Sequence, residues 1–304
     1  MAPIRIGTRG SRLALWQANY VTDRLRRQAL GRPIELVEIE TIGDQIRDRP
    51  LSQIGGDGLF TKEIQRALLT GSVDVAVHSL KDLPTLAVEG LTLAAVPPRG
   101  RAGDVFVSRK YRSFDLLPEG AKVATSSLRR QAMILHRRHD LHVINIRGNV
   151  ETRLRKLDGE ELDAIILAQA GLERLGLGDA IREVLDASWM LPAVGQGALG
   201  LECRVEDQAT LDLVRRLDDY ATHQAVLAER AFLRGLGGGC LVPIGAASLV
   251  KHETLSLRGA VLRPDGSKRI EAEQSGNVQD PDHLGRQLAD RLLASGAGKL
   301  LELG

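Results

Sequence analysis

Short runs of β-branched residues alternate with amphipathic segments along most of this chain, and no other feature constrains its fold as strongly. This alternation is typical of a parallel sheet that is covered by helices on both faces. In the first part of the chain it predicts strands at residues 4–7, 34–39 and 73–77, and helices at residues 13–30 and 62–69.

A second series of the same kind begins after the sequence Pro-Pro-Arg-Gly at residues 97–100. The predicted strands are 104–108, 122–125, 141–146 and 164–168, and the predicted helices are 128–138 and 150–157. Two α/β units of similar size, joined at a proline and glycine break, indicate an α/β fold with two doubly wound domains. Ligands of such folds bind in the crevice at the carboxyl ends of the strands, so we expect the binding residues there.

The last part of the chain has a different pattern. A helix is predicted at residues 224–233, and a glycine-rich turn follows it. Strands are predicted at 254–262 and 269–273, and a final helix at 283–294. We interpret this region as a smaller α+β C-terminal domain.

The composition indicates a soluble globular protein. Of the 304 residues, 43% are hydrophobic and 26% are charged, and the formal net charge is +2. A chain so close to neutral is not a general polyanion binder, so we expect no nucleic acid partner. No stretch approaches the roughly 18 apolar residues needed to span a bilayer, and the N-terminus lacks a basic segment followed by an apolar run. We therefore expect no membrane association and a cytoplasmic location.

The chain contains two cysteines, Cys203 and Cys240. We expect no disulfide and no metal site, and therefore free sulfurs unless one is modified, because an isolated disulfide does not persist in a reducing compartment and two thiols without clustered histidines bind zinc poorly. Three glycines at residues 237–239 precede Cys240. Because glycine has no Cβ, a bulky group on this sulfur could lie against the backbone. The alternative is a small buried cysteine that fills a gap in the turn.

Arginine is concentrated in the second series, where residues 99–174 contain twelve arginines and three lysines. A guanidinium group binds a carboxylate through two parallel hydrogen bonds, whereas lysine acts as a point charge. Loops 7–11, 125–130 and 146–153 each place arginine beside glycine, asparagine or hydroxyl residues where a strand ends, and N–H groups at a helix start favour an anion. The chain lacks a Gly-x-x-x-x-Gly-Lys-Ser/Thr sequence and a complete Gly-x-Gly-x-x-Gly sequence. We therefore expect a ligand with several carboxylates rather than a nucleotide.

The sequence His78-Ser-Leu-Lys-Asp82 follows the third predicted strand, at the rim of the expected crevice. Its positive neighbours favour an ionised Asp82 at neutral pH. Such a carboxylate can stabilise a cationic intermediate and relay a proton. The alternative is nucleophilic hydrolysis by His78, Ser79 and Cys240, but the chain has no Gly-x-Ser-x-Gly sequence to support it.

Together these motifs resemble the porphobilinogen deaminase family, whose members are also called hydroxymethylbilane synthases. The resemblance covers about the first 245 residues in order. It rests on the motifs Gly7-Thr-Arg-Gly-Ser-Arg-Leu-Ala-Leu-Trp16, Gly55-Gly-Asp-Gly-Leu-Phe-Thr-Lys-Glu63, Val77-His-Ser-Leu-Lys-Asp82, Thr125-Ser-Ser-Leu-Arg-Arg130, Arg147-Gly-Asn149, Leu191-Pro-Ala-Val-Gly-Gln-Gly197 and Gly238-Gly-Cys240.

The resemblance implies a transferase that joins four porphobilinogen molecules head to tail, releases four ammonia molecules and yields the linear tetrapyrrole hydroxymethylbilane. It implies a dipyrromethane cofactor attached by a thioether to Cys240. Asp82 would be the catalytic group that helps ammonia depart, stabilises the azafulvene-like cation and assists deprotonation of the pyrrole. The positions that would bind the acetate and propionate groups of cofactor and substrate are Arg9, Ser11, Lys81, Thr125, Ser127, Arg129, Arg130, Arg147, Arg153, Arg174 and Gln196.

The resemblance also implies two domains similar to periplasmic binding proteins and a third domain that carries the cofactor. The domain limits would be 1–98 with 193–218, then 99–192, then 219–304, and the protein would be a monomer. The chain departs from the family pattern at Gln53 and Asp57, where we expect lysines, within a segment (43–58) expected to form a mobile loop over the cleft. A non-catalytic two-lobed carboxylate-binding protein is the competing hypothesis, and it leaves Cys240 unexplained.

Overall fold

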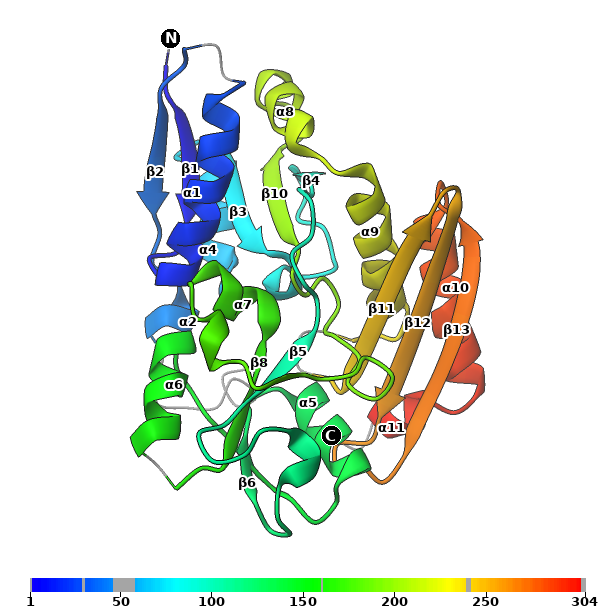
Figure 1. Cartoon of the computed structure of the whole chain (residues 1–304). Coiled ribbons are helices and arrows are strands. Elements are labelled where there is room, and N and C mark those ends of the chain that lie inside the picture. Colours follow the sequence, from blue (N-terminus) through cyan, green and yellow to red (C-terminus); the bar gives the residue numbers. More distant parts are fainter. Residues whose placement is uncertain (1, 29–30, 46–57, 160, 239–241, 302–304) are drawn as a thin grey trace.

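Two sheets of mixed direction and one smaller antiparallel sheet form the protein (Figure 1). The computed structural model describes residues 2–28, 31–45, 58–159, 161–238 and 242–301. We refer to the three parts built around these sheets as the first, second and third units.

The first unit is a five-stranded sheet in the order β2-β1-β3-β10-β4. Its strands are β1 (Ile4–Thr8), β2 (Ile34–Glu38), β3 (Val75–Ser79), β4 (Leu91–Ala95) and β10 (Leu199–Arg204). Strand β1 is parallel to β2 and β3, whereas β10 is antiparallel to both of its neighbours. The chain therefore leaves this unit after β4 and returns to its sheet at β10.

The second unit repeats this plan in the order β7-β6-β8-β5-β9. Its strands are β5 (Asp104–Val107), β6 (Lys122–Ala124), β7 (His142–Ile144), β8 (Ala164–Ala168) and β9 (Glu183–Val184). Strand β6 is parallel to β7 and β8, and β5 is antiparallel to β8. The sheets are thus mixed rather than parallel, because the strand that follows each crossing between the units enters its sheet in the opposite direction.

Helices cover both faces of these sheets, as the alternating pattern predicts. In the first unit, α1 (Arg12–Arg26) and α8 (Gln208–Val214) pack on one face and α4 (Lys62–Leu69) on the other. In the second unit, α5 (Leu128–Arg137) packs on one face, and α6 (Val150–Gly159) and α7 (Gln169–Arg174) pack on the other.

The third unit is an antiparallel sheet of β11 (Ile244–Lys251), β12 (Thr254–Leu262) and β13 (Arg269–Asn277). Helices α9 (Tyr220–Gly235) and α10 (Pro281–Ala294) share a core with this sheet, built around Phe232, Leu257 and Leu288, and α11 (Gly298–Leu301) follows. Figure 1 shows this sheet beside the other two units.

The limits of the first helix and of the third strand differ from the prediction. The first helix ends at Arg26, although we expected it to reach residue 30. The third strand spans Val75–Ser79 instead of residues 73–77, because β1 sets its register by pairing Ile6 with Val75. His78 and Ser79 therefore belong to β3 itself, and only the next three residues form a turn.

Candidate active site between the two α/β units

A single 3₁₀ turn at the carboxyl end of β3 carries Lys81 and Asp82. This turn, η1 (Leu80–Asp82), is anchored by the side chain of Leu80, which is 1% exposed, and by a 3.0 Å hydrogen bond from the Leu80 N–H to the carbonyl of Ala198. Ser79 precedes the turn and exchanges hydrogen bonds with the amide of Gln17 on α1. The turn thus holds Lys81 and Asp82 at the carboxyl end of β3, and ligands of open α/β sheets bind at such strand ends.

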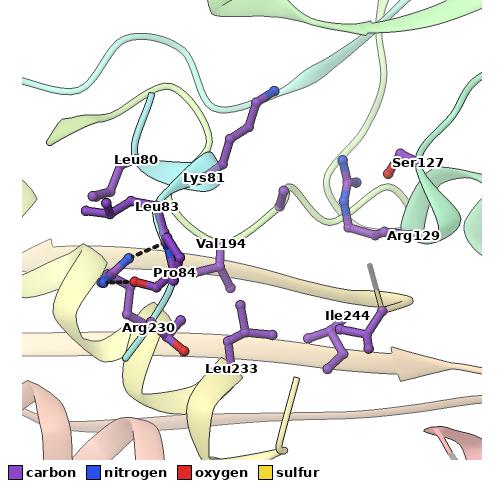
Figure 2. A pocket seen from close by; sticks show the side chains of 13 residues that line it. Leu80, Lys81, Leu83, Pro84, Ser127, Arg129, Val194, Arg230, Leu233 and Ile244 are labelled. Carbon is purple, nitrogen blue, oxygen red and sulfur yellow. Dashed lines mark hydrogen bonds between the residues drawn. The ribbon is translucent and has the colours of Figure 1, made fainter. Parts of the chain in front are cut away.

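Two cavities meet at Lys81. The first, of about 60 Å³, lies where the three units meet, and Figure 2 shows Lys81 on one side of it and Ser127 and Arg129 on the other. Arg230 of α9 also lines this cavity and donates hydrogen bonds to the carbonyls of Leu83 and Pro84 at 2.9 and 2.6 Å (Figure 2). The second cavity, of about 90 Å³, lies between the first and second units. Apolar residues line it together with Ser79, Lys81, Arg130, Arg153 and Arg174.

The positive charges at this junction perturb one another. Burial is the main cause of a lowered pKa of about 8 at Lys81; the charge of Asp82 acts to raise this pKa and that of Arg130 to lower it. Burial also lowers the pKa of Arg153 to about 10, with further lowering by Arg130 and Arg147 and an opposing influence from Asp82. Asp82 and Asp104 thus both act on Lys81 within a cluster of cations. Such a cluster favours binding of anions.

Arg129 and Arg130 lie at the start of α5 and are 3% and 5% exposed. The carboxylate of Asp104, the first residue of β5, accepts hydrogen bonds from Nη1 of Arg129 at 2.7 Å and from Nε and Nη2 of Arg130 at 3.0 and 2.7 Å. Burial acts to raise the pKa of the Asp104 carboxyl, but the two guanidinium groups outweigh it and hold that pKa below its usual range. Gln196, which is 1% exposed, donates to the same carboxylate at 2.9 Å.

The hydroxyl residues before α5 shape the loop. Ser127 caps the helix by accepting a 3.4 Å hydrogen bond from the N–H of Arg130, and Thr125, which is buried, accepts one from the N–H of Ser127 at 3.2 Å. Of these two, Ser127 lines the first cavity. The loop therefore presents a helix start and two arginines to the junction, as expected from the sequence.

The remaining candidates lie around this centre at different depths. Arg153 donates to the carbonyl of Gly148 at 2.8 Å, and the positive charge of Arg147 acts to lower the pKa of Arg153. Arg174 donates to the carbonyl of Gly197 at 2.6 Å. Arg9 pairs with Asp44 and lies over the ring of Phe60, and Ser11 caps α1; neither lines either cavity.

Some expected residues lie outside the described part of the chain. These are Cys240, Gln53 and Asp57. Val242, two residues beyond Cys240 in the sequence, and Leu233 of α9 both line the first cavity. The other cysteine, Cys203, is fully buried in the core of the first unit, where burial raises the pKa of its thiol to about 12.

Asp104 is a residue of this site that the sequence alone did not identify. An acidic side chain at the start of the apolar strand Asp-Val-Phe-Val was the available signal, because a buried carboxylate requires a partner. His78, by contrast, lies in the interior with its Nε2 3.1 Å from Oε2 of Glu202, outside hydrogen-bond geometry, and lines neither cavity. This position gives no support to a hydrolytic role for His78.

Within the described ranges, no helix has the length and apolar character needed to cross a membrane. No group of three or more histidine, cysteine or acidic residues suited to a metal ion occurs among those residues either.

The fold and the junction together define a two-lobed α/β protein with a third unit attached, in which Asp82 and Asp104 lie among the arginines of the junction. A family model described as "Porphobilinogen deaminase, dipyromethane cofactor binding domain" matches residues 4–212, and one described as "Porphobilinogen deaminase, C-terminal domain" matches residues 223–294. The chain belongs to the porphobilinogen deaminase family. It is therefore a transferase that makes hydroxymethylbilane from porphobilinogen and uses a dipyrromethane cofactor.

Curated relatives agree over nearly the whole length. The chain is 51% identical to "Porphobilinogen deaminase" of Syntrophotalea carbinolica over 298 residues, which is 98% of this chain and 95% of the relative. It is 52% identical to "Porphobilinogen deaminase" of Shouchella clausii over 304 residues, which is 99% of this chain and 97% of the relative. Among solved structures, a putative methionine-binding lipoprotein of Bacillus subtilis is similar at 12% identity with a TM-score of 0.44, over 71% of this chain and 89% of that protein.

Proposed function

We propose that Asp82 is the catalytic acid–base of this transferase and that the surrounding cations bind the carboxylates of cofactor and substrate. The observation that carries the proposal is the position of the Lys81–Asp82 turn: Lys81 lines both cavities, and the charge of Asp82 reaches Lys81 and Arg153. The proposed carboxylate-binding residues are Arg9, Ser11, Lys81, Thr125, Ser127, Arg129, Arg130, Arg147, Arg153, Arg174 and Gln196.

The described residues fit a cofactor that carries several carboxylates. Nε of Arg129 is buried and has no hydrogen-bond partner among them, and Arg129 lines the first cavity. A buried donor without a partner is costly, and a ligand carboxylate would satisfy it. We propose that Ser127 and Arg129 hold the dipyrromethane in the first cavity and that Cys240, in the segment just before Val242, is its attachment point.

When bound, the dipyrromethane supplies the nucleophilic pyrrole carbon to which substrate is added. The carboxylate of Asp82 stabilises the positive charge that develops on the pyrrole as the protonated amino group of porphobilinogen leaves as ammonia. The same carboxylate accepts the proton released from the pyrrole after the new carbon–carbon bond forms. Arg130, Arg153 and Arg174 orient the substrate through its carboxylates, which lowers the entropic part of the barrier.

Intact-mass measurement and a turnover assay test this proposal together. The purified chain is expected to carry the extra mass of one dipyrrole, and Cys240→Ser is expected to lose it. Asp82→Asn is expected to keep the extra mass while losing nearly all turnover, because the amide cannot stabilise the cation or accept a proton. An unmodified wild-type chain would favour the two-lobed binding protein instead, and near-normal turnover in Asp82→Asn would remove Asp82 from the mechanism.

We further propose that the enzyme is a cytoplasmic monomer with no nucleic acid partner. The net charge of +2 supports the absence of a nucleic acid partner. The domain limits that we propose are 1–98 with 193–218, then 99–192, then 219–304. The pairing of β10 with β3 and β4 supports a discontinuous first domain.

A further inference from the structure

We propose that Asp104 is a positioning residue: it holds the guanidinium groups of Arg129 and Arg130 in fixed orientations toward the two cavities before a ligand carboxylate arrives. This inference rests on the proposed carboxylate-binding function of that arginine pair, and it assigns a role to an acidic residue that itself lines neither cavity.

The geometry fixes both arginines through one carboxylate. Asp104 is 0% exposed, and its two oxygens are divided between the arginines: Oδ2 accepts from Arg129, and Oδ1 accepts from two nitrogens of Arg130. Among their other contacts, Arg129 Nη1 donates to the carbonyl of Leu191 at 2.5 Å, Arg130 Nη1 donates to that of Ile166 at 3.0 Å, and Arg130 Nη2 donates to Oε1 of Gln196 at 3.4 Å. Arg129 thereby lines the first cavity and Arg130 the second.

The charge balance distinguishes this cluster from an ordinary buried ion pair. A buried pair is tolerated when each charge is matched, but here Asp104 is the ion-pair partner of both arginines among the described residues. One carboxylate for two guanidinium groups leaves positive charge in excess, and burial lowers the pKa of Arg129. An arrangement that keeps excess charge in place suits later binding of an anion, because the cost of ordering the arginines is met in advance.

Gln196 extends the cluster to the segment that returns to the first unit. Its Nε2 donates to Asp104 Oδ1 at 2.9 Å and to the carbonyl of Ala102 at 2.6 Å. Its backbone carbonyl accepts a hydrogen bond from Nε of Arg99 at 2.8 Å. Asp104 therefore links the arginine pair to both segments, 97–103 and 193–198, that connect the first and second units. Asp104 thus contacts the arginine pair from a position that lines neither cavity.

The substitution Asp104→Asn tests this role, because it keeps the size of the side chain but removes the charge and one acceptor. We expect the KM for porphobilinogen to rise about tenfold or more, as for loss of a charge-assisted hydrogen bond, with a much smaller change in kcat. The extra mass of the cofactor is expected to appear more slowly. Glu202→Gln is the matched control, since Glu202 is a 5% exposed carboxylate in the first unit that bonds Gln65 and lines neither cavity; it is expected to lower stability and leave KM unchanged.

The pH profile provides a readout that a purely structural role would not change. Lys81 is surrounded by Asp82 in its own turn, Arg129 and Arg130 on α5, Asp104 on β5, and by Arg153 and Arg174 across the second cavity. Asp104 acts to raise the pKa of Lys81, so its neutralisation is expected to move the alkaline limb of kcat/KM to lower pH. The Glu202→Gln control is expected to leave this limb in place.

The outcomes separate this inference from the proposed function. A wild-type chain without dipyrrole mass or turnover would overturn the proposed function itself. An active wild type with Asp104→Asn showing wild-type KM and an unshifted alkaline limb, whatever its stability, would overturn the role of Asp104. If Asp104→Asn does not fold, Gln196→Leu removes one bond to the same carboxylate but keeps its charge. A smaller rise in KM with an unshifted alkaline limb then supports the inference, and an unchanged KM contradicts it.

Discussion

At the scale of single residues, Lys81 is a buried cation whose charged form destabilises the folded protein. Its pKa is lowered from 10.5 to about 8, mainly by burial. Between these two pH values the unfolded chain binds more protons than the folded one, so the free energy of unfolding rises with pH across this window. Below pH 8 the folded protein bears the whole destabilisation caused by burial of the charged Lys81. We therefore predict that Lys81→Met stabilises the apoprotein at pH 7 by about 1 to 2 kcal/mol while it abolishes turnover.

The pH dependence of the melting temperature checks this prediction. The gain from Lys81→Met should be constant below about pH 8 and should disappear as the pH approaches 10.5. Lys110→Met is the control, because Lys110 forms an exposed ion pair with Asp163 that raises its pKa, and it should give no gain at any pH. An equal gain from Lys81→Met at pH 7 and pH 10 would contradict the electrostatic explanation.

At the scale of elements, the two connecting segments touch at Gly197. This residue has φ +83°, and a Cβ on it would lie 2.6 Å from the carbonyl oxygen of Gly100. Its own carbonyl accepts hydrogen bonds from the N–H of Gly100 at 3.1 Å and from Arg174 at 2.6 Å. Gly197→Ala must therefore separate the segments, and we predict a loss of about 2 kcal/mol or more in the free energy of unfolding.

Urea denaturation measures this loss, with Gly178→Ala as the matched control because no atom lies within 4 Å of a Cβ at that position. The control should change the midpoint little. A midpoint for Gly197→Ala close to that of the control would show that the segments are not in tight contact in solution.

The sequence predicted those elements whose signals are local. The strand at 164–168 was predicted with its observed limits, and the helix start at Leu128 follows from Ser127, which caps it. Strand β10 was not predicted, because it pairs with β3 and β4, which lie more than a hundred residues earlier in the chain. Local pattern carries no information about such pairing, so the antiparallel direction of β5 and β10 could not be predicted either.

The candidate site, too, could be predicted only where its signals are local. Arginines and hydroxyl residues stand out by residue type and spacing, so Arg129, Arg130 and Ser127 could be selected from the sequence. The bond between Asp104 and the arginine pair joins residues 25 and 26 positions apart, and only the fold brings them together. The burial of Gln196 could not be predicted for the same reason.

At the scale of the whole molecule, the third unit is fixed to both of the others. Arg230 donates to carbonyls of Leu83 and Pro84 in the first unit, and the carbonyl of Gly266, between β12 and β13, lies 2.8 Å from Nδ1 of His136 on α5 in the second. Where the connecting segments cross, α9 contributes Glu229, which is 0% exposed. These contacts fix α9 and the sheet of the third unit relative to the other two units.

Glu229 is the centre of this three-way junction. Its carboxylate accepts hydrogen bonds from two nitrogens of Arg99 at 2.6 and 3.1 Å, from the N–H of Gly195 at 2.7 Å and from Oγ of Ser248 at 2.5 Å. Removal of either partner of a buried ion pair leaves an unmatched charge, which costs about 3 to 5 kcal/mol. We predict that Glu229→Ala and Arg99→Ala each destabilise the protein strongly and that the double variant loses much less than the sum.

A double-mutant cycle on the free energy of unfolding measures this coupling, which we expect to be about 1.5 to 3 kcal/mol. The matched cycle on Arg109 and Asp158, whose side chains are 47% and 50% exposed, is expected to give less than about 1 kcal/mol, since solvent screens such a pair. The difference between the two cycles isolates what burial at the junction adds. Additive losses at Glu229 and Arg99 would contradict the prediction that this buried ion pair couples the third unit to the connecting segment.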